Sequence, residues 1–303
     1  MTRSTRTSGV IASLVGVVSI ACAACSTPAD RAVSTTAQAA GVDPALSAQT
    51  TGTAQSGAAT LTFDGSRAWN YLERQVAFGP RPSGTPALDA CRRFIIEELG
   101  RLGIAAREQS FDATTPIGTI RMTNVIATIP GRRSDRIVLA SHYDTKRFKE
   151  FAFVGASDGA SSTAALLELG RVLKARSNEY TIELLFLDGE EAVNTEWRDP
   201  DNTYGSKHYV QDARQTTTLA SLKALILLDM IGDRQLNIRR EAQSSRWLTD
   251  IIWASAAALD HRTSFIDETF PIEDDHVPFL QARSEEHTSE LQSHHDLVCR
   301  LLL

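Results

Sequence analysis

Three carboxylates follow the most apolar run of the sequence. The stretch LLFLDGEEA, residues 184–192, contains three leucines and a phenylalanine and then Asp188, Glu190 and Glu191. The apolar half is typical of a strand that is buried on both faces. Because removing ionised carboxyl groups from water is costly unless a cation compensates their charge, this spacing indicates a metal ion at the end of the strand.

Acids and histidines also follow the other predicted strands of the chain. They are His142, Asp144, Asp158, Asp229, Asp274, Asp275 and His276. In α/β proteins the ligand site lies beyond the carboxyl ends of the strands, so we expect these side chains to converge at one edge of a sheet. A helix N-cap explains Asp158 by itself and a turn explains Asp229 by itself, but neither explains the recurrence at consecutive strand exits. Oxygen and nitrogen donors in this combination suit zinc.

The order of the predicted elements indicates the fold class. From Asp64 onward helical and strand patterns alternate, which is typical of an α/β domain with a mixed, mostly parallel sheet between helices. Helices are expected at about 65–77, 87–102, 159–175, 205–213 and 244–259. Strands are expected at about 105–112, 119–129, 136–141, 181–187, 224–230 and 263–267. The segment GPRPSGTP, residues 79–86, is expected to be a rigid, turn-rich connection.

Composition and charge narrow the class of partner. The 303 residues are 42% hydrophobic and 22% charged, which is typical of a globular protein with one domain of catalytic size and additional segments. The net charge of −6 is made without a long basic run, and this argues against nucleic acid as the main partner. A peptide or another small molecule is the expected substrate.

Residues 1–25 have the layout of a secretory signal. Two arginines precede an apolar stretch, residues 10–20, and small residues follow. The stretch is too short to span a membrane comfortably, so we expect an exported protein of the periplasm or cell envelope. Cys22 and Cys25 stand where a lipoprotein signal has its acylated cysteine, and we expect lipid anchoring through one of them, with simple cleavage and release as the alternative.

The segment after the signal is predicted to be a flexible tether. Residues 26–60 are mostly Ala, Ser, Thr, Gln and Gly, which cannot bury enough apolar surface to fold. Beyond the signal only Cys91 and Cys299 remain, so the protein is not a disulfide scaffold. Cys91 shares a predicted helical face with Leu88 and Ile95, which favours a core position over a nucleophile.

Seven motifs in a fixed order resemble a known family. They are GPRPSGTP, SHYDTK, FVGASDGASS, FLDGEEA, YGSKH, LILLDMIGD and DDHVPFL. From Asp64 to Ala282 the chain resembles the zinc aminopeptidase-like superfamily, peptidase family M28, and within it the glutaminyl-peptide cyclotransferases, or glutaminyl cyclases. The resemblance implies a three-layer αβα sandwich with a central mixed, mostly parallel sheet over residues 61–282, truncated at its C-terminal end.

The resemblance also implies roles for individual residues. Asp158 and Glu191 would be zinc ligands, and Glu190 would be the general acid and base. Asp229 and Asp274 would form a hydrogen-bonded acid pair that binds the substrate amine and passes protons.

Three further residues receive roles from the same resemblance. Trp197 would wall the substrate pocket, although this sequence has one extra residue between Glu191 and the tryptophan. His142 and Asp144 would support the ligands of a cyclase with one zinc ion. In an aminopeptidase with two zinc ions, His142 and Asp229 would hold the second ion.

Three activities are compatible with this set of residues. The doubled acid of DDHVPF, the region of Trp197 and the motif LLDMIGD favour a zinc-dependent cyclase that converts the N-terminal glutamine of peptides to pyroglutamate and releases ammonia. A zinc aminopeptidase that hydrolyses N-terminal residues is the alternative. A non-catalytic binding module is the third hypothesis, and the intact Glu190 argues against it.

The sequence changes character after Ala282. It continues RSEEHTSELQSHHDLVCRLLL, and this tract contains His287, His294 and His295. Histidine-rich tracts can bind metal, but RSEEHTSELQS is similar to the in-frame translation of a sequencing-library adapter. We therefore predict that residues 283–303 are read-through, that they lie unpacked, and that their histidines do not approach the metal site.

The resemblance requires one more metal ligand than the sequence provides. In the family a further strand and a loop with a histidine, the third zinc ligand, follow DDHVPFL. His276 is the obvious substitute for this third ligand, but by the resemblance it is a structural neighbour of the acid pair. Because a catalytic zinc normally has three protein ligands and an open position, we expect this chain to be a truncated and poorly active version of an enzyme.

Overall fold

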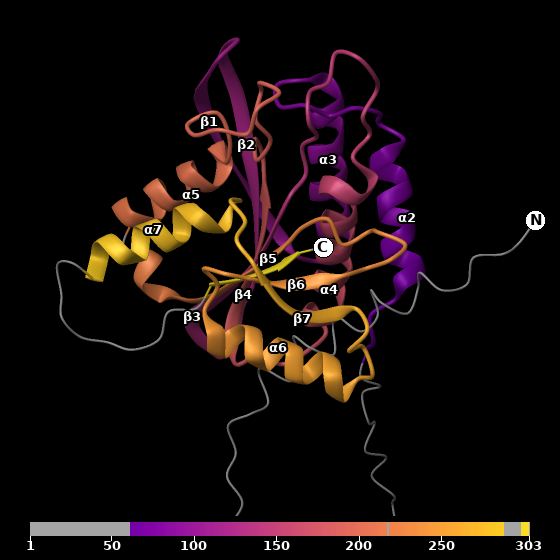
Figure 1. Cartoon of the computed structure of the whole chain (residues 1–303), viewed down its shortest axis with the longest axis vertical. Helices are drawn as coiled ribbons and strands as arrows, with labels where there is room; N and C mark the ends of the chain where they lie inside the picture. Colours follow the sequence, from indigo (N-terminus) through magenta and orange to yellow (C-terminus); the bar gives the residue numbers. More distant parts are fainter. Residues whose placement is uncertain (1–60, 217, 288–297, 303) are drawn as a thin grey trace, which may run out of the picture.

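One mixed sheet runs through the computed structural model, which describes residues 61–216, 218–287 and 298–302 and the side chains up to residue 282. Its strands are β1 (Ala105–Thr115), β2 (Gly118–Ile129), β3 (Arg133–His142), β4 (Tyr180–Leu187), β5 (Leu222–Leu228), β6 (Ile238–Glu241), β7 (Phe265–Phe270) and β8 (Val298–Leu302). They lie side by side in the order β1-β2-β4-β3-β5-β8-β6-β7. The hairpin β1–β2 extends beyond the rest of the sheet (Figure 1).

The centre of the sheet is parallel. Strand β3 pairs in parallel with β4 on one side and with β5 on the other, whereas β2 joins β4 in the antiparallel direction. The register places His142 opposite Leu187 and Ala140 opposite Leu227. The carboxyl ends of these three strands are therefore nearly level, and the residues that follow them emerge at one edge.

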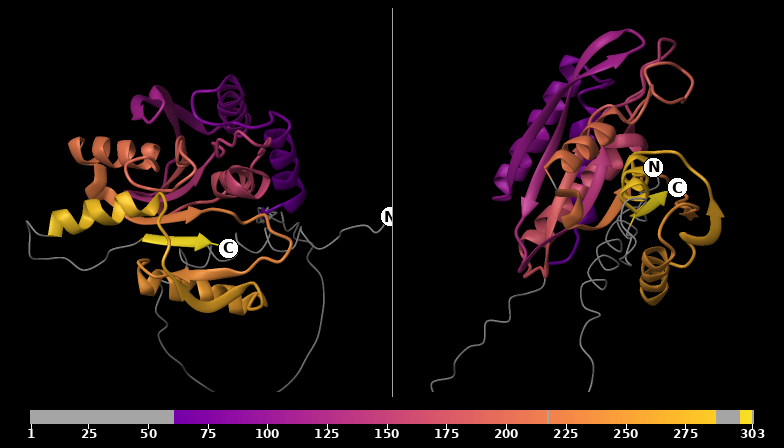
Figure 2. Two further views of the ribbon diagram at one scale, coloured as in Figure 1. Left: turned by 45° about the horizontal axis from the view of Figure 1, so that its top comes forward. Right: turned by 90° about the vertical axis from the view of Figure 1, so that its left-hand side faces the viewer.

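Helices cover both faces of the sheet. They are α2 (Gly65–Val76), α3 (Pro86–Arg101), α4 (Ser162–Lys174), α5 (Tyr204–Gln215), α6 (Arg246–Ala258) and α7 (His276–His287), with shorter helical turns at Ala156–Ser161 and Thr218–Ser221. Helices α2, α3 and α4 lie on one side, and α5 and α7 lie on the other (Figures 1 and 2). The predicted three-layer αβα sandwich is confirmed.

Alternation along the central strands separates two hydrophobic cores. On β4, Leu184 and Phe186 face the core that includes the buried side of α4, whereas Leu185 and Leu187 face the core beneath α5 and α7. Successive side chains of a strand point to opposite faces, so a strand covered on both sides must be apolar throughout. This arrangement explains the uninterrupted apolar run that precedes Asp188.

Most predicted elements are present within a few residues of their expected bounds. The five predicted helices correspond to α2 to α6, and the six predicted strands correspond to β1 to β5 and β7. Strand β6 was not predicted because it has only four residues, of which only Ile238 is apolar. Helix α7 was not predicted because its first turn contains Pro278, although proline is tolerated in the first turn of a helix.

The prediction that residues 283–303 lie unpacked is wrong for the part of their backbone that the structure describes. Instead of lying unpacked, this part continues α7 to His287 and contributes β8, which pairs with β5 and β6. Four of the five residues 298–302 are apolar, which suits a strand, and this pairing satisfies backbone groups along β5 that the interior of a sheet cannot leave unpaired. The side chain of His287 and both His294 and His295 lie outside the described residues, and the read-through origin stays a prediction.

Several predictions concern parts of the chain beyond the described residues. The signal at 1–25, the tether at 26–60 and the anchoring cysteines Cys22 and Cys25 all fall there. Among the described residues, no helix combines the length and the apolar composition needed to cross a membrane.

Asp188 ties three separate segments together beneath the edge of the sheet. Its carboxylate accepts hydrogen bonds from the Ser83 hydroxyl at 2.6 Å and from the Thr123 N–H at 2.7 Å. Its own N–H donates to the Asn124 side chain at 3.1 Å. Burial, followed by the charge of Asp144, raises the pKa of Asp188 to about 7 although both donors lower it. The first of the three carboxylates after β4 is therefore a structural link.

Gly205 in the first turn of α5 brings the helix close to the end of β4. A Cβ atom at this position would lie 2.5 Å from the Asn124 Oδ1 atom and closer still to the Asp188 carbonyl oxygen. The Asn124 amide donates to the Gly205 carbonyl at 2.9 Å. A residue without a side chain is required here because the helix and the strand end pack backbone to backbone.

The variant Asp188→Asn should change the pH dependence of stability. The folded-state pKa of about 7 exceeds the ordinary value of 3.8, so the wild type loses stability as pH rises from the lower to the higher value. Asparagine does not ionise, and the wild type should fall relative to the variant by roughly 3–5 kcal/mol over this range. Urea unfolding of zinc-free protein at several pH values measures the difference. Parallel profiles for the two proteins would contradict this role, and Asp112→Asn on the surface is the control.

The variant Gly205→Ala should destabilise the fold, by roughly 1–3 kcal/mol, because the added methyl group has no space. The matched control is Gly100→Ala in α3, where an added Cβ meets nothing within 4 Å. The control should gain roughly 0.5–1 kcal/mol because alanine is the better helix former. Thermal unfolding of both variants checks the opposite signs, and equal shifts would show that close packing at Gly205 has no special effect.

Candidate active site

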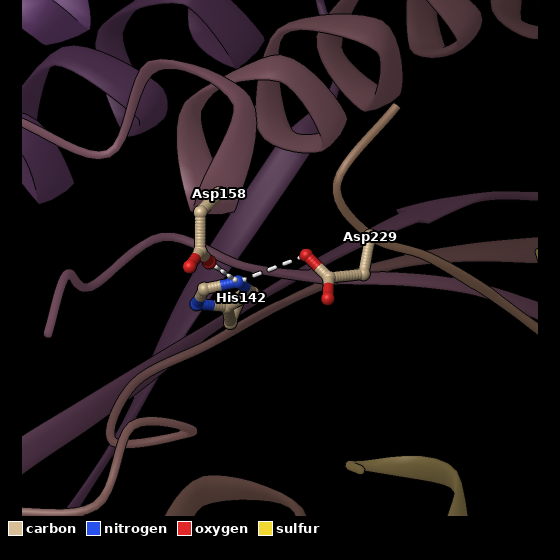
Figure 3. Close-up of side chains that lie close together, drawn as sticks. All are labelled: His142, Asp158 and Asp229. Atoms are coloured by element: carbon tan, nitrogen blue, oxygen red, sulfur yellow. Dashed lines mark hydrogen bonds and ion pairs between the residues drawn. The ribbon is translucent and has the colours of Figure 1, made fainter. Parts of the chain in front are cut away.

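His142, the last residue of β3, lies among four carboxylates. Its Nε2 atom is 3.1 Å from Asp158 Oδ1 and 3.1 Å from Asp229 Oδ1, as Figure 3 shows. Its Nδ1 atom is 3.4 Å from Asp144 Oδ1 and 3.7 Å from Glu190 Oε2. The imidazole is 1% exposed. Both ring nitrogens are thus directed at acidic oxygens in the interior.

The residues on the Nε2 side fit a metal ion. One donor atom each from His142, Asp158 and Asp229 lies within 4.8 Å of the other two. A zinc ion bound at about 2.0–2.2 Å by imidazole nitrogen and carboxylate oxygen requires donors separated by about 3–4 Å, so the group needs only a small contraction. The Asp158 side chain is 27% exposed, which leaves an approach from solvent.

The turn before α4 brings Asp158 to this position. Asp158 has φ −88° and ψ 112°, and Gly159 has φ +82°, so the chain is not helical at these two residues. A Cβ atom on Gly159 would lie 2.7 Å from the Asp144 carbonyl oxygen and 3.2 Å from the His142 ring. Glycine is therefore required both for the left-handed conformation and for the close approach to the histidine.

Asp144 fixes the backbone of the two glutamates after β4. Its carboxylate accepts hydrogen bonds from the N–H of Glu190 at 3.2 Å and of Glu191 at 3.3 Å. Lys146 lies on the other side, with its Nζ 3.9 Å from Glu191 Oε2 and donating to the Ala192 carbonyl at 2.7 Å. Bonds from the backbone to a charged acceptor are strong, so the direction of both glutamates is set by the chain that follows β3.

The site carries an excess of negative charge. Its acidic residues are Asp144, Asp158, Glu190, Glu191, Asp229, Asp274 and Asp275. Burial raises the pKa of Glu190 well above its usual range, with His142 opposing and Asp274 reinforcing the change. Burial and then Asp158 raise the pKa of Glu191 to about 8. Burial lowers the pKa of His142, but the carboxylates outweigh burial and raise it well above its usual range. Protons or a cation must offset this charge.

The Asp274–Asp275 pair lies directly before α7 and is held by hydrogen bonds. The Asp275 N–H donates to Asp274 Oδ1 at 2.5 Å, and Asp275 Oδ1 accepts from the Ser206 hydroxyl at 2.6 Å. The next residue, His276, places Nε2 3.4 Å from Glu241 Oε2, and both side chains are fully buried. The pair is therefore held between α5 and β6.

The predicted site residues largely come together. His142 contacts Asp144, Asp158, Asp229 and Glu190 directly. Asp274 lies close enough to raise the pKa of Glu190, and Asp158 close enough to raise that of Glu191. The division of these residues into ligands, base and acid pair stays a prediction. Trp197 is half-buried on the loop after Glu191, and its role in the pocket also stays a prediction.

Four supporting residues were not predicted from the sequence. They are Lys146, Asp201, Ser206 and Glu241. Lys146 and Ser206 lie inside SHYDTK and YGSKH, two of the motifs that carry the resemblance. Their place in these motifs could have indicated that they support the site. Glu241 lies on the short strand β6, and nothing in its sequence neighbourhood links it to His276.

Comparisons with known proteins place the chain in a family. The family model for peptidase family M28 matches residues 124–287. The glutaminyl-peptide cyclotransferase-like protein of Bos taurus is 31% identical over 251 residues, which are 72% of this chain and 64% of the relative. The glutaminyl-peptide cyclotransferase of Drosophila melanogaster is 29% identical and covers 67% of this chain and 64% of its own length. The chain thus spans slightly less than two thirds of these curated relatives.

Solved structures agree with this placement. The glutaminyl cyclase of an Acidobacteriales bacterium is 35% identical with a TM-score of 0.69, covering 81% of this chain and 80% of its own. The glutaminyl cyclase of Porphyromonas gingivalis is 28% identical with a TM-score of 0.69, covering 79% and 83%. A Zn-dependent exopeptidase of Parabacteroides distasonis, at 24% identity, shares the fold with a TM-score of 0.70, covering 80% and 85%. Because the family model matches more than half of its 303 residues, the chain belongs to peptidase family M28.

Proposed function

We propose that the chain is a zinc-dependent glutaminyl-peptide cyclotransferase, which converts the N-terminal glutamine of a peptide to pyroglutamate with release of ammonia. The observation that carries this proposal is the buried Glu190 carboxyl among the acids that gather at the exits of β3, β4 and β5. The glutaminyl cyclases similar to the chain support the choice of substrate.

The residues that would hold zinc come from three strand exits. Asp158 and Glu191, together with a further histidine, make the one-ion arrangement that the family resemblance implies. The group of His142, Asp158 and Asp229 offers donors for an ion on the Nε2 side of the ring. When bound by these residues, zinc would supply a Lewis acid for the γ-carboxamide oxygen of the glutamine substrate.

Glu190 moves the proton in the proposed reaction. As the α-amine nitrogen attacks the γ-carbon, a bond between them forms, and Glu190 accepts a proton from that nitrogen. The carboxyl group then returns the proton to the leaving nitrogen as the bond from the γ-carbon breaks, so that ammonia departs. A carboxyl group that first takes and then returns a proton acts in turn as general base and general acid.

Asp229 and Asp274 would receive the substrate amine. Both are buried at the same sheet edge as Glu190, and an anionic pocket of this kind favours an N-terminal ammonium group. Trp197 would cover the glutamine side chain from the loop that follows Glu191. An internal residue of a peptide has no ammonium group for the two aspartates to bind. The acid pair therefore favours a free N-terminus.

An aminopeptidase is the second candidate, and one observation favours it. His142 and Asp229, the residues that hold the second ion in two-zinc members according to the resemblance, face each other at 3.1 Å. In that reaction Glu190 would take a proton from the attacking water and pass it to the leaving amine. The two candidates use the same glutamate and differ in the nucleophile, whereas a binding module would use neither.

Two peptides distinguish these activities. Incubation with a Gln-initiated peptide should release ammonia and reduce the peptide mass by the mass of ammonia, because cyclisation expels the γ-nitrogen. A Leu-initiated peptide of otherwise identical sequence should remain intact. Loss of a whole residue from the second peptide would identify the aminopeptidase, and no change in either would favour the binding module. Mass spectrometry and an ammonia assay report the result.

The variant Glu190→Gln should lose activity by at least roughly 10²–10⁴-fold, because the amide cannot accept and return the proton. Its zinc content should equal that of the wild type. The matched control is Glu196→Gln, a change of the same kind on an exposed residue of the following loop, which should retain full activity. Unchanged turnover in Glu190→Gln would remove this residue from the mechanism.

Zinc titration of the wild type and three variants tests the ligand assignment. Asp158→Asn should bind zinc at least roughly 100-fold more weakly than the wild type, because this residue is a ligand in both arrangements. His142→Asn should keep one ion per chain in a cyclase and lose one of two in an aminopeptidase. Plasma emission analysis gives the stoichiometry. Wild-type affinity in Asp158→Asn would contradict the proposed centre, and Asp112→Asn is the surface control.

A further inference from the structure

One carboxylate ties the chain that leaves the glutamate pair to helix α5. Asp201 Oδ1 accepts hydrogen bonds from the Val193 N–H at 2.9 Å and from the Tyr204 hydroxyl at 2.7 Å. Asp201 Oδ2 accepts from the Asn194 N–H at 2.9 Å. The residue is 8% exposed. Three bonds to one mostly buried carboxylate make a strong local anchor, because each is charge-assisted.

The backbone on the near side of this anchor is equally constrained. The Thr203 N–H donates to the Glu190 carbonyl at 2.9 Å, and the Tyr204 N–H donates to the Gly189 carbonyl at 2.7 Å. Asp144 accepts the N–H groups of Glu190 and its neighbour. Thr203 holds a left-handed φ of +47°, which is unfavourable for a β-branched residue and persists only where the surroundings determine it.

Lys207 fixes the far side of the same loop. Its ammonium group donates to Asp199 Oδ1 at 2.6 Å and to the side-chain and backbone oxygens of Asn202 at 3.1 and 3.0 Å. Trp197 lies between Val193, which Asp201 holds, and Asp199, which Lys207 holds, along the sequence. The course of the loop is therefore set from both ends by side chains that do not enter the metal group.

We propose that Asp201 is a positioning residue, which holds Glu190, Glu191 and Trp197 in place by binding the backbone that joins them. Asp144 and Asp201 act as a pair of carboxylates on either side of Ala192, one accepting N–H groups before it and the other accepting N–H groups after it. The consequence for turnover rests on the proposed function, whereas the consequence for the backbone does not.

Hydrogen exchange of the metal-free full chain tests the anchor directly. In Asp201→Ala the Val193 and Asn194 amides lose their acceptor and should exchange at least about tenfold faster than in the wild type. Asp201→Asn keeps one accepting oxygen and should show an intermediate rate. Amides of β4 should not change, which separates a local anchor from general destabilisation. Glu196→Gln on the same loop is the control and should match the wild type.

Two functional readouts complete the test. In Asp201→Ala, kcat for a Gln-initiated peptide should fall at least about tenfold and more than KM changes, because Glu190 is displaced from the reacting atoms. Zinc affinity should fall several-fold because Glu191 moves with the same backbone. Faster exchange with unchanged kcat and zinc affinity would overturn the positioning role, and so would unchanged exchange.

The design keeps failure of this inference apart from failure of the proposed function. A wild type without cyclase activity overturns the proposed function, while exchange at Val193 and Asn194 and zinc affinity still decide the role of Asp201. If Asp201→Ala does not fold, Tyr204→Phe removes only the hydroxyl that the carboxylate accepts. This milder variant should raise exchange at the same two amides by a smaller factor, and wild-type rates in it would overturn the inference.

Discussion

The accumulation of carboxylates at the ends of parallel strands is the constraint on which this site depends. Ionised acids in the interior need donors, protons or a cation, and the structure supplies each in a different place. Asp144, Asp188 and Asp201 accept hydrogen bonds from backbone or hydroxyl groups. Asp158 and Asp229 instead face the nitrogen of a histidine. The same residue type thus builds the frame and lines the centre, and Asp144 does both, because it also lies 3.4 Å from His142 Nδ1.

The hydrogen bonds around Glu190 matter for the proposed chemistry because they fix its backbone. Backbone hydrogen bonds hold Glu190 from the chain that follows β3 and from the start of α5, so the carboxyl group can change its protonation while its position stays constant. General acid–base catalysis needs this combination. Both proposed reactions, cyclisation and hydrolysis, would use such a group and would differ in the nucleophile.

The sequence predicted the strands and the convergence of acids because both follow from local pattern. An apolar run such as residues 184–187 identifies a strand, and parallel strands bring their exits together. The distinct roles of Asp188 and Glu190 were less accessible, since the donors to Asp188 are 105 and 65 residues away along the chain. The short strand β6 has too few residues for a periodic pattern. The pairing of β8 depends on the unpaired edge of β5, which exists only once the rest of the sheet has formed.

The level ends of β3 and β4 have a consequence for the divergence of related proteins. With His142 opposite Leu187, ladder hydrogen bonds within the sheet determine where the side chains of the site begin. The pocket walls come from loops, such as the one carrying Trp197, that can lengthen, shorten or exchange residues without shifting those ladders. A change of substrate can therefore be made in the loops alone, while the strand ends keep the acids and His142 in place.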